Sequence, residues 1–303
     1  MSTPLPTSHC PDWATALCNG FSQIFLQRQP LCGVFCLLAI LVGAPTLLGG
    51  ALLGAVSGLL TAQRRGYAKA ERQAGLYSYN GVLLGMLLSY RLPWSALLPL
   101  LIIASAGLST LLIEQWLKRA RHPQSLLAYT APFVGLGWII LHLNHTPSPA
   151  LPDAQTVNSL SLLLALFKGV GQVMLLQHPV AGLLIVTGLW LSSWRAAVWA
   201  LTGSLAGLLC SLYQQDPATA LSGIAGYNPA LAALALSQQR RQFWLPLAGI
   251  LATLLLTPAF TALGLPLLTA PFILACWLVQ AAVRLLKPVI LKSEEQCRLR
   301  IER

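Results

Sequence analysis

Apolar stretches of about 20 residues, each long enough to cross a hydrocarbon core of about 30 Å, recur through almost the whole chain. Hydrophobic residues make up 56% of the 303 residues and charged residues only 9%, whereas soluble domains carry roughly a quarter charged residues. The runs are uniformly apolar, which favours helices over the alternating strands of a membrane barrel. The sequence therefore predicts an all-α polytopic membrane protein, embedded in the lipid bilayer of the inner or plasma membrane.

The positive charge of the chain indicates topology rather than a nucleic-acid partner. The formal net charge is +11, and most basic residues gather in four short segments, at 64–72, 118–121, 240–241 and 284–303. In a membrane protein such clusters mark the cytoplasmic side. The first 20 residues lack the basic start and apolar run of a signal peptide. We therefore expect a cytoplasmic N-terminal tail at 1–12 and a basic cytoplasmic C-terminal tail at 287–303.

An internal repeat divides the chain into two halves. Residues 22–33 read SQIFLQRQPLCG and align without gaps with residues 171–182, which read GQVMLLQHPVAG. Two further blocks match in the same order, at 75–87 with 223–235 and at 129–133 with 268–272. Three matched blocks in one order predict two homologous repeats, which we place at 13–145 and 161–286.

The charge pattern predicts how the repeats lie in the membrane. Each has about six apolar segments, which we interpret as about five spans plus one re-entrant or half-helix piece near the glutamine–proline block. An odd number of spans makes the second repeat enter from the opposite side, as in many transporters. The basic loop at 63–72 corresponds to 211–219, which contains no Lys or Arg, as inversion requires. The linker at 146–160 is then extracytoplasmic, and a pore is expected between the halves.

These doubled blocks resemble the urea transporter family over about residues 13–285. The matching elements are the doubled glutamine–proline block, the doubled YN block at 79–80 and 227–228, and the doubled TAPF block. The resemblance implies passive, channel-like facilitated diffusion of urea through a pore in each protomer of a homotrimer. It implies neither an enzyme nor a cofactor.

Two glutamines and two threonines are the interior polar candidates for binding a solute. A glutamine carbonyl and a threonine hydroxyl both accept hydrogen bonds, which suits a solute with several N–H donors. Gln23 and Gln172 precede Pro30 and Pro179, where we expect a helix to end and leave carbonyls unpaired. By resemblance, the two glutamines flank the outer and inner binding positions of the pore. The alternative is that they only pack between helices.

Thr130 and Thr269 stand in the repeated Thr-Ala-Pro sequence. By resemblance they face the narrow middle of the pore and divide the two binding positions. A simpler alternative is that each hydroxyl satisfies a backbone carbonyl freed by the neighbouring proline.

Aromatic and leucine positions are expected to restrict the thickness of the solute. Tyr79 with Leu83, and Tyr227 with Leu231, each share one helix face. The resemblance implies a slot formed by two phenylalanines at each binding position, but here the aromatic positions hold tyrosine and the partner positions are Leu26 and Leu175. A phenol hydroxyl can also bond to solute or water. Asn80 and Asn228 are interpreted as capping or turn residues.

Several alternatives stay open at this stage. The leucines in the slot leave room for a pore of relaxed selectivity that admits small amides, ammonia or water. A membrane scaffold without transport is a second alternative. Ion-coupled transport is disfavoured, since the acidic residues lie in tails, loops or segment ends and coupled carriers usually need an intramembrane ionisable group. We expect no metal site, because Cys32 with Cys36 and His142 with His145 lack further ligands.

Overall fold

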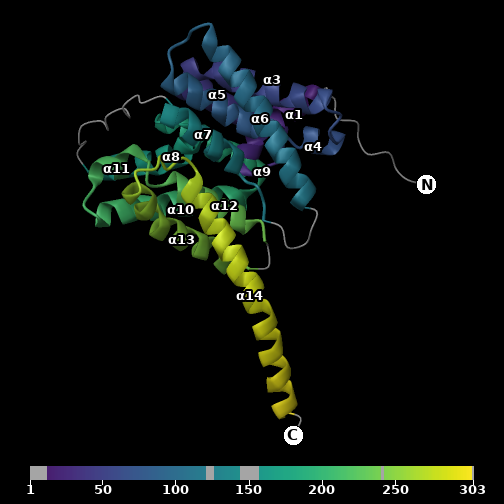
Figure 1. Ribbon diagram of the computed structural model, residues 1–303. Helices are drawn as coiled ribbons and strands as arrows, with labels where there is room; N and C mark the ends of the chain where they lie inside the picture. The colour runs from purple at the N-terminus through teal and green to yellow at the C-terminus, as the bar shows by residue number, and fades with distance from the viewer. Residues whose placement is uncertain (1–11, 121–125, 144–156, 240–241, 302–303) are drawn as a thin grey trace.

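The computed structural model describes residues 12–120, 126–143, 157–239 and 242–301, and in these ranges all regular structure is helical (Figure 1). The predicted N-terminal tail, apart from Asp12, and most of the predicted linker at 146–160 lie outside the described residues. The predicted C-terminal tail continues the last helix as far as Ile301. The all-α polytopic fold class is confirmed.

The order of helices in the first half is repeated in the second. The first half contains α1 (Asp12–Ser22), η1 (Gln23–Phe25), α2 (Pro30–Gly43), η2 (Pro45–Leu47), α3 (Leu48–Arg64), α4 (Lys69–Gln73), α5 (Tyr79–Arg91), α6 (Leu97–Ala120) and α7 (Ala131–Leu143). The second contains α8 (Ser159–Gly171), η3 (Gln172–Met174), α9 (Pro179–Ser192), α10 (Trp194–Tyr213), α11 (Pro217–Ser222), α12 (Tyr227–Ser237), α13 (Trp244–Ala262) and α14 (Ala270–Ile301). The orientation of each half across the membrane stays a prediction.

Helix length separates long outer helices from short inner ones. Within the described residues, four helices are long and apolar enough to cross a membrane, namely Pro45–Arg64, Leu97–Ala120, Trp194–Tyr213 and Trp244–Ala262. Two bent helix pairs raise this number to six if each pair counts as one span. The predicted count of about five spans per half stays untested by length alone. By contrast, α5 has 13 residues, or about 20 Å, and its residues from Tyr79 to Leu88 are all buried.

The predicted break near the glutamines is present, but the proline does not end the helix. Helix α1 stops at Ser22, a single 3₁₀ turn follows, and Leu26 adopts a left-handed conformation with φ 58°. Pro30 then begins α2, where its missing N–H removes no helical hydrogen bond. The second half repeats this, with Leu175 at φ 58° and Pro179 beginning α9. The two helix pairs are bent by 76° and 77°, so the chain turns sharply inside each half.

Glycines let the helices of each half approach closely. A Cβ on Gly54 of α3 would collide with the backbone carbonyl of Gly81 in α5. Gly203 of α10 packs in the same way against the carbonyl of Pro229 in α12. Glycine at both positions therefore brings a long outer helix against a short inner one, since small residues let two helix backbones approach closely.

The two halves are joined by α2 and α9 and by a pair of reciprocal tryptophan contacts. Gly43 of α2 lies against Ala181 of α9, and Figure 1 shows α9 among the helices of the first half. The indole N–H of each tryptophan donates across the boundary between the halves, Trp138 to the carbonyl of Pro266 at 2.8 Å and Trp277 to that of Leu127 at 2.9 Å.

We expect Gly54→Ala and Gly203→Ala each to lower the free energy of unfolding by about 1–3 kcal/mol, because the added methyl group overpacks a backbone contact. Gly135→Ala is the matched control, since nothing lies within 4 Å of a Cβ at this helical position. The control is expected to keep or raise the melting temperature. Thermal unfolding in detergent measures all three, and equal melting temperatures would contradict the close-packing interpretation.

Candidate functional site

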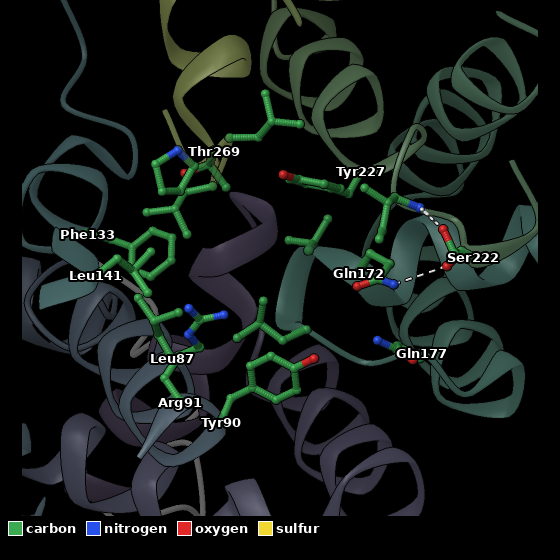
Figure 2. Close-up of a pocket in the computed structure, with 16 residues that line it drawn as sticks. Leu87, Tyr90, Arg91, Phe133, Leu141, Gln172, Gln177, Ser222, Tyr227 and Thr269 are labelled. Carbon is green, nitrogen blue, oxygen red and sulfur yellow. Dashed lines mark hydrogen bonds between the residues drawn. The ribbon is translucent and has the colours of Figure 1, made fainter. Parts of the chain in front are cut away.

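Two cavities occupy equivalent positions in the two halves. The Gln23 cavity has a volume of about 570 Å³, and its lining includes Gln23, Leu26, Tyr79 and Tyr129. The Gln172 cavity has a volume of about 300 Å³, and its lining includes Gln172, Leu175, Tyr227, Leu268 and Thr269 (Figure 2). The folded chain thus brings the glutamine, leucine and tyrosine predicted for each half around one cavity. Their roles in transport stay predictions.

Gln172 is held so that its amide oxygen is available to a ligand. The residue is 8% exposed, and its Nε2 donates to the backbone carbonyl of Ser222 at 3.0 Å. Figure 2 shows the amide oxygen on the opposite side, turned toward the cavity. The short turn η3 carries this glutamine directly after α8, so the broken helix fixes its place. The geometry suits an acceptor for solute N–H groups.

Gln23 presents a different hydrogen-bonding state. It is also 8% exposed, and its Oε1 is buried and has no hydrogen-bond partner among the residues that the structure describes. A buried carbonyl oxygen without a donor costs about 1–3 kcal/mol. A water or solute N–H in the adjoining cavity would remove this cost.

The two threonines meet at the boundary between the halves. Their Oγ1 atoms are 2.7 Å apart, and both residues are buried. Thr269 lines the Gln172 cavity, whereas Thr130 directly follows Tyr129, which lines the Gln23 cavity. The hydroxyls therefore pair with each other between the cavities. The alternative expected from the sequence, a bond to a freed backbone carbonyl, is not the contact observed.

Four residues with a left-handed backbone line these cavities. Sequence reasoning named Leu26 and Leu175 as slot residues but missed Tyr129 and Leu268, and it predicted the left-handed conformation of none of them. Leu26 and Leu175 both have φ 58°, Tyr129 has φ 44° and Leu268 has φ 39°. For a residue other than glycine, this conformation costs roughly 1–2 kcal/mol. Such strain persists only where the surrounding structure enforces it, and it gathers at functional sites. Nothing in a leucine or tyrosine signals it, since neither residue favours this conformation.

The tyrosines and leucines predicted for the slot lie in different surroundings, and their roles in transport stay predictions. The Tyr79 hydroxyl donates to the backbone carbonyl of Tyr129, so it serves the protein rather than a solute. Figure 2 shows the Tyr227 hydroxyl directed into the Gln172 cavity. Leu83 and Leu231 are only 1% and 2% exposed and lie in the core, where they line neither cavity. They face the interior because α5 and α12 are buried on all sides.

The capping role of the two asparagines is confirmed. Asn80 Oδ1 accepts from the backbone N–H of Phe133 at 3.2 Å, in the first turn of α7. Asn228 Oδ1 accepts from that of Phe272 at 3.3 Å, in the first turn of α14. Each asparagine thus satisfies an N–H that has no partner within its own helix. The bond fixes the Thr-Ala-Pro segment against the helix that carries the tyrosine.

The mouths of the cavities contain charged and amide residues that sequence reasoning also missed. The Gln23 cavity contains Arg28 and Gln239, and the Gln172 cavity contains Gln177 and Arg91. These positions correspond by the repeat, so arginine and glutamine exchange places between the halves. The repeat alignment, extended to these positions, would have shown that each arginine of the first half is matched by a glutamine of the second. No Asp or Glu lines either cavity in the described part of the chain.

One acidic residue lies deeper than the sequence suggested. Glu114 is 8% exposed and sits within α6 rather than at its end. Its carboxylate accepts from the Tyr77 hydroxyl at 2.6 Å and pairs with Lys118 at 3.2 Å. It lines neither cavity.

The threonine pair predicts a non-additive loss of stability. Thr130→Val should lower the free energy of unfolding by about 1–3 kcal/mol, because it leaves the Thr269 hydroxyl buried and unpaired. The double variant Thr130→Val/Thr269→Val should lose less than the sum of the single variants, because both polar groups are removed. Unfolding in detergent measures the stability of the single and double variants, with Thr202→Val, at a partly exposed threonine, as a control. Additive losses would show that the hydroxyls do not interact.

Comparison with known proteins agrees with this arrangement. The family model described as "Urea transporter" matches residues 14–284. Urea transporter 1 of Ovis aries is 27% identical over 292 residues, which cover 87% of this chain and 74% of the relative. Urea transporter 1 of Rattus norvegicus is 27% identical over 291 residues, which cover 88% of this chain and 73% of that protein. Because the family model spans most of the chain, the protein belongs to the urea transporter family.

Proposed function

We propose that the chain forms a passive pore for urea, built in each protomer from both halves of the sequence. The observation that carries the proposal is the pair of equivalent cavities, each lined by a buried glutamine, with paired threonine hydroxyls between them. Membership of the urea transporter family and the names of the relatives support urea as the solute. Transport, rather than catalysis, is the role expected of such a path.

The lining of the cavities matches the chemistry of urea. Urea has four N–H donors and one carbonyl acceptor, and it must shed water to enter a narrow path. The Gln172 amide oxygen accepts a solute N–H, while Leu175 and Tyr227 provide apolar walls. Phe133 and Tyr90 add aromatic rings on the other side of this cavity, in place of the phenylalanine missing from the slot (Figure 2). Hydrogen-bonding groups that replace the solute's hydration make such a pore selective.

Passive flow follows from the charges around the path. The lining contains arginine at each mouth and, among the described residues, no carboxylate that binds a proton or sodium ion. Glu114 is paired with Lys118 and Tyr77 away from both cavities. Carriers coupled to an ion gradient usually place an ionisable group within the path. A neutral solute therefore moves down its own gradient.

The topology that we propose follows the charge pattern. The N- and C-termini lie in the cytoplasm, the linker at 146–160 lies outside, and the halves cross the inner or plasma membrane in opposite senses. We also propose a homotrimer, as the family resemblance implies. Large apolar side chains are exposed, such as Leu38 of α2, Leu100 of α6 and Leu255 of α13, and they are available to lipid or to neighbouring protomers.

Gln172→Leu is expected to reduce urea permeability about tenfold, because the solute loses an acceptor while it is partly dehydrated. Stopped-flow light scattering on proteoliposomes measures the rate, with formamide and water for comparison. Gln214→Leu is the matched control, since this exposed glutamine lines neither cavity and should leave urea flux unchanged. If the wild-type protein gave a urea flux no faster than that of empty liposomes, the proposal would be contradicted. Accumulation of urea driven by a pH or sodium gradient would contradict its passive character.

A further inference from the structure

Among the positions related by the repeat, two buried ones change from polar to apolar between the cavities. Tyr129 and Gln280 line the Gln23 cavity. Their counterparts are Leu268 and Leu141, which line the Gln172 cavity. A polar pair on one side is therefore replaced by two leucines on the other. Buried polar groups need a hydrogen-bonding reason to be retained, so the difference points to chemistry on the Gln23 side.

Tyr129 is held in place from several directions. Its φ of 44° turns the chain directly before Thr130. Its backbone carbonyl accepts the Tyr79 hydroxyl, and its ring meets that of Phe272 edge-on with centroids 5.1 Å apart. Its own hydroxyl oxygen accepts from Gln280 Nε2 at 2.7 Å. With 5% of Tyr129 and 9% of Gln280 exposed, the pair is fixed before any ligand arrives.

The bond from Gln280 leaves the proton of the Tyr129 hydroxyl to be donated, and the protein group beside it is the thiol of Cys276, whose sulfur is a weak acceptor that a solute oxygen can replace. A phenol oxygen accepts and donates at once, and here the acceptor side is occupied by the amide of Gln280. On the same cavity, Gln23 Oε1 is a buried acceptor without a partner among the described residues. The Gln23 cavity thus combines a hydroxyl donor with a carbonyl acceptor. Those are the two groups that a planar amide needs for its C=O and N–H.

We propose that Tyr129, positioned by Gln280, is a binding residue that donates a hydrogen bond to the carbonyl oxygen of the solute in the Gln23 cavity. The assignment rests on the proposed function, since it requires that a small amide passes through this cavity. The equivalent tyrosine, Tyr79, does not fill this role, because its hydroxyl donates to the protein backbone. On the Gln172 side the hydroxyl directed into the cavity belongs to Tyr227 (Figure 2). Non-equivalent tyrosines therefore supply the donor in the two halves.

The test compares urea with thiourea, whose sulfur accepts hydrogen bonds more weakly than oxygen does. Equilibrium exchange of labelled solute in proteoliposomes gives the half-saturating concentration of each. Tyr129→Phe keeps the ring and removes only the hydroxyl, so the value for urea should rise about fivefold and that for thiourea less than twofold. Tyr213→Phe is the matched control, since this exposed hydroxyl lines neither cavity and should change neither value.

Gln280→Leu provides a second variant that leaves the tyrosine intact. It removes the amide that orients the Tyr129 hydroxyl, so the ratio between urea and thiourea should shift in the same direction. If both variants transported urea as fast as the wild type, and the ratio of the half-saturating concentrations of urea and thiourea were unchanged, the assignment would be overturned while the urea pore stands. Lack of urea flux in the wild type would overturn the proposed function and this assignment together. If Tyr129→Phe does not fold, Gln280→Leu alone decides the assignment.

Discussion

Where a helix breaks inside a bilayer, a backbone carbonyl that loses its helical hydrogen bond needs another donor, because no water is present in the hydrocarbon to supply one. In this protein some of these donors come from the same half, as with Tyr79 and Tyr129, and three come from the opposite half. Gln238 Nε2 reaches the carbonyl of Leu26 at 3.1 Å, where the first broken helix turns. The reciprocal tryptophan contacts satisfy the carbonyls just before the two Thr-Ala-Pro segments, namely Leu127 and Pro266. At these three carbonyls, irregular backbone is satisfied by contact between the halves.

This dependence explains why the cavities lie where they do. The segments that break the helical pattern meet between the halves, and they carry the strained residues Leu26, Tyr129, Leu175 and Leu268. Short helices α5 and α12 are buried behind them and provide the asparagines that cap α7 and α14. A straight helix at either break would satisfy its own backbone but would lack the turn whose residue, Leu26 or Leu175, lines a cavity. The strained backbone conformation therefore accompanies the turns that line the cavities.

Residues whose roles depend on side-chain chemistry alone were predictable in kind. An amide and a hydroxyl repeated at matching positions in an apolar chain indicated polar groups facing a solute. In the structure Gln23 lines one cavity, and Gln172 and Thr269 line the other. Roles that depend on the neighbouring residues in the folded structure were not predictable from the sequence. The Tyr79 hydroxyl is used by a carbonyl that only the left-handed turn at Tyr129 brings near. A spacing argument placed Leu83 beside Tyr79, but it gave no information on which face of a fully buried helix lines the cavity.

Apolar length, charge and internal repetition determined the fold class, the two halves and the residue types at their junction, because membrane burial and topology act on each segment separately. The tertiary structure alone decided which hydroxyl is available, which carbonyl is satisfied and where a leucine must adopt a positive φ. Those outcomes depend on pairs such as Tyr129 with Gln280 and Thr130 with Thr269, whose members come from opposite halves. No local pattern specifies such a pair, since the energy of each bond exists only when both halves are packed together.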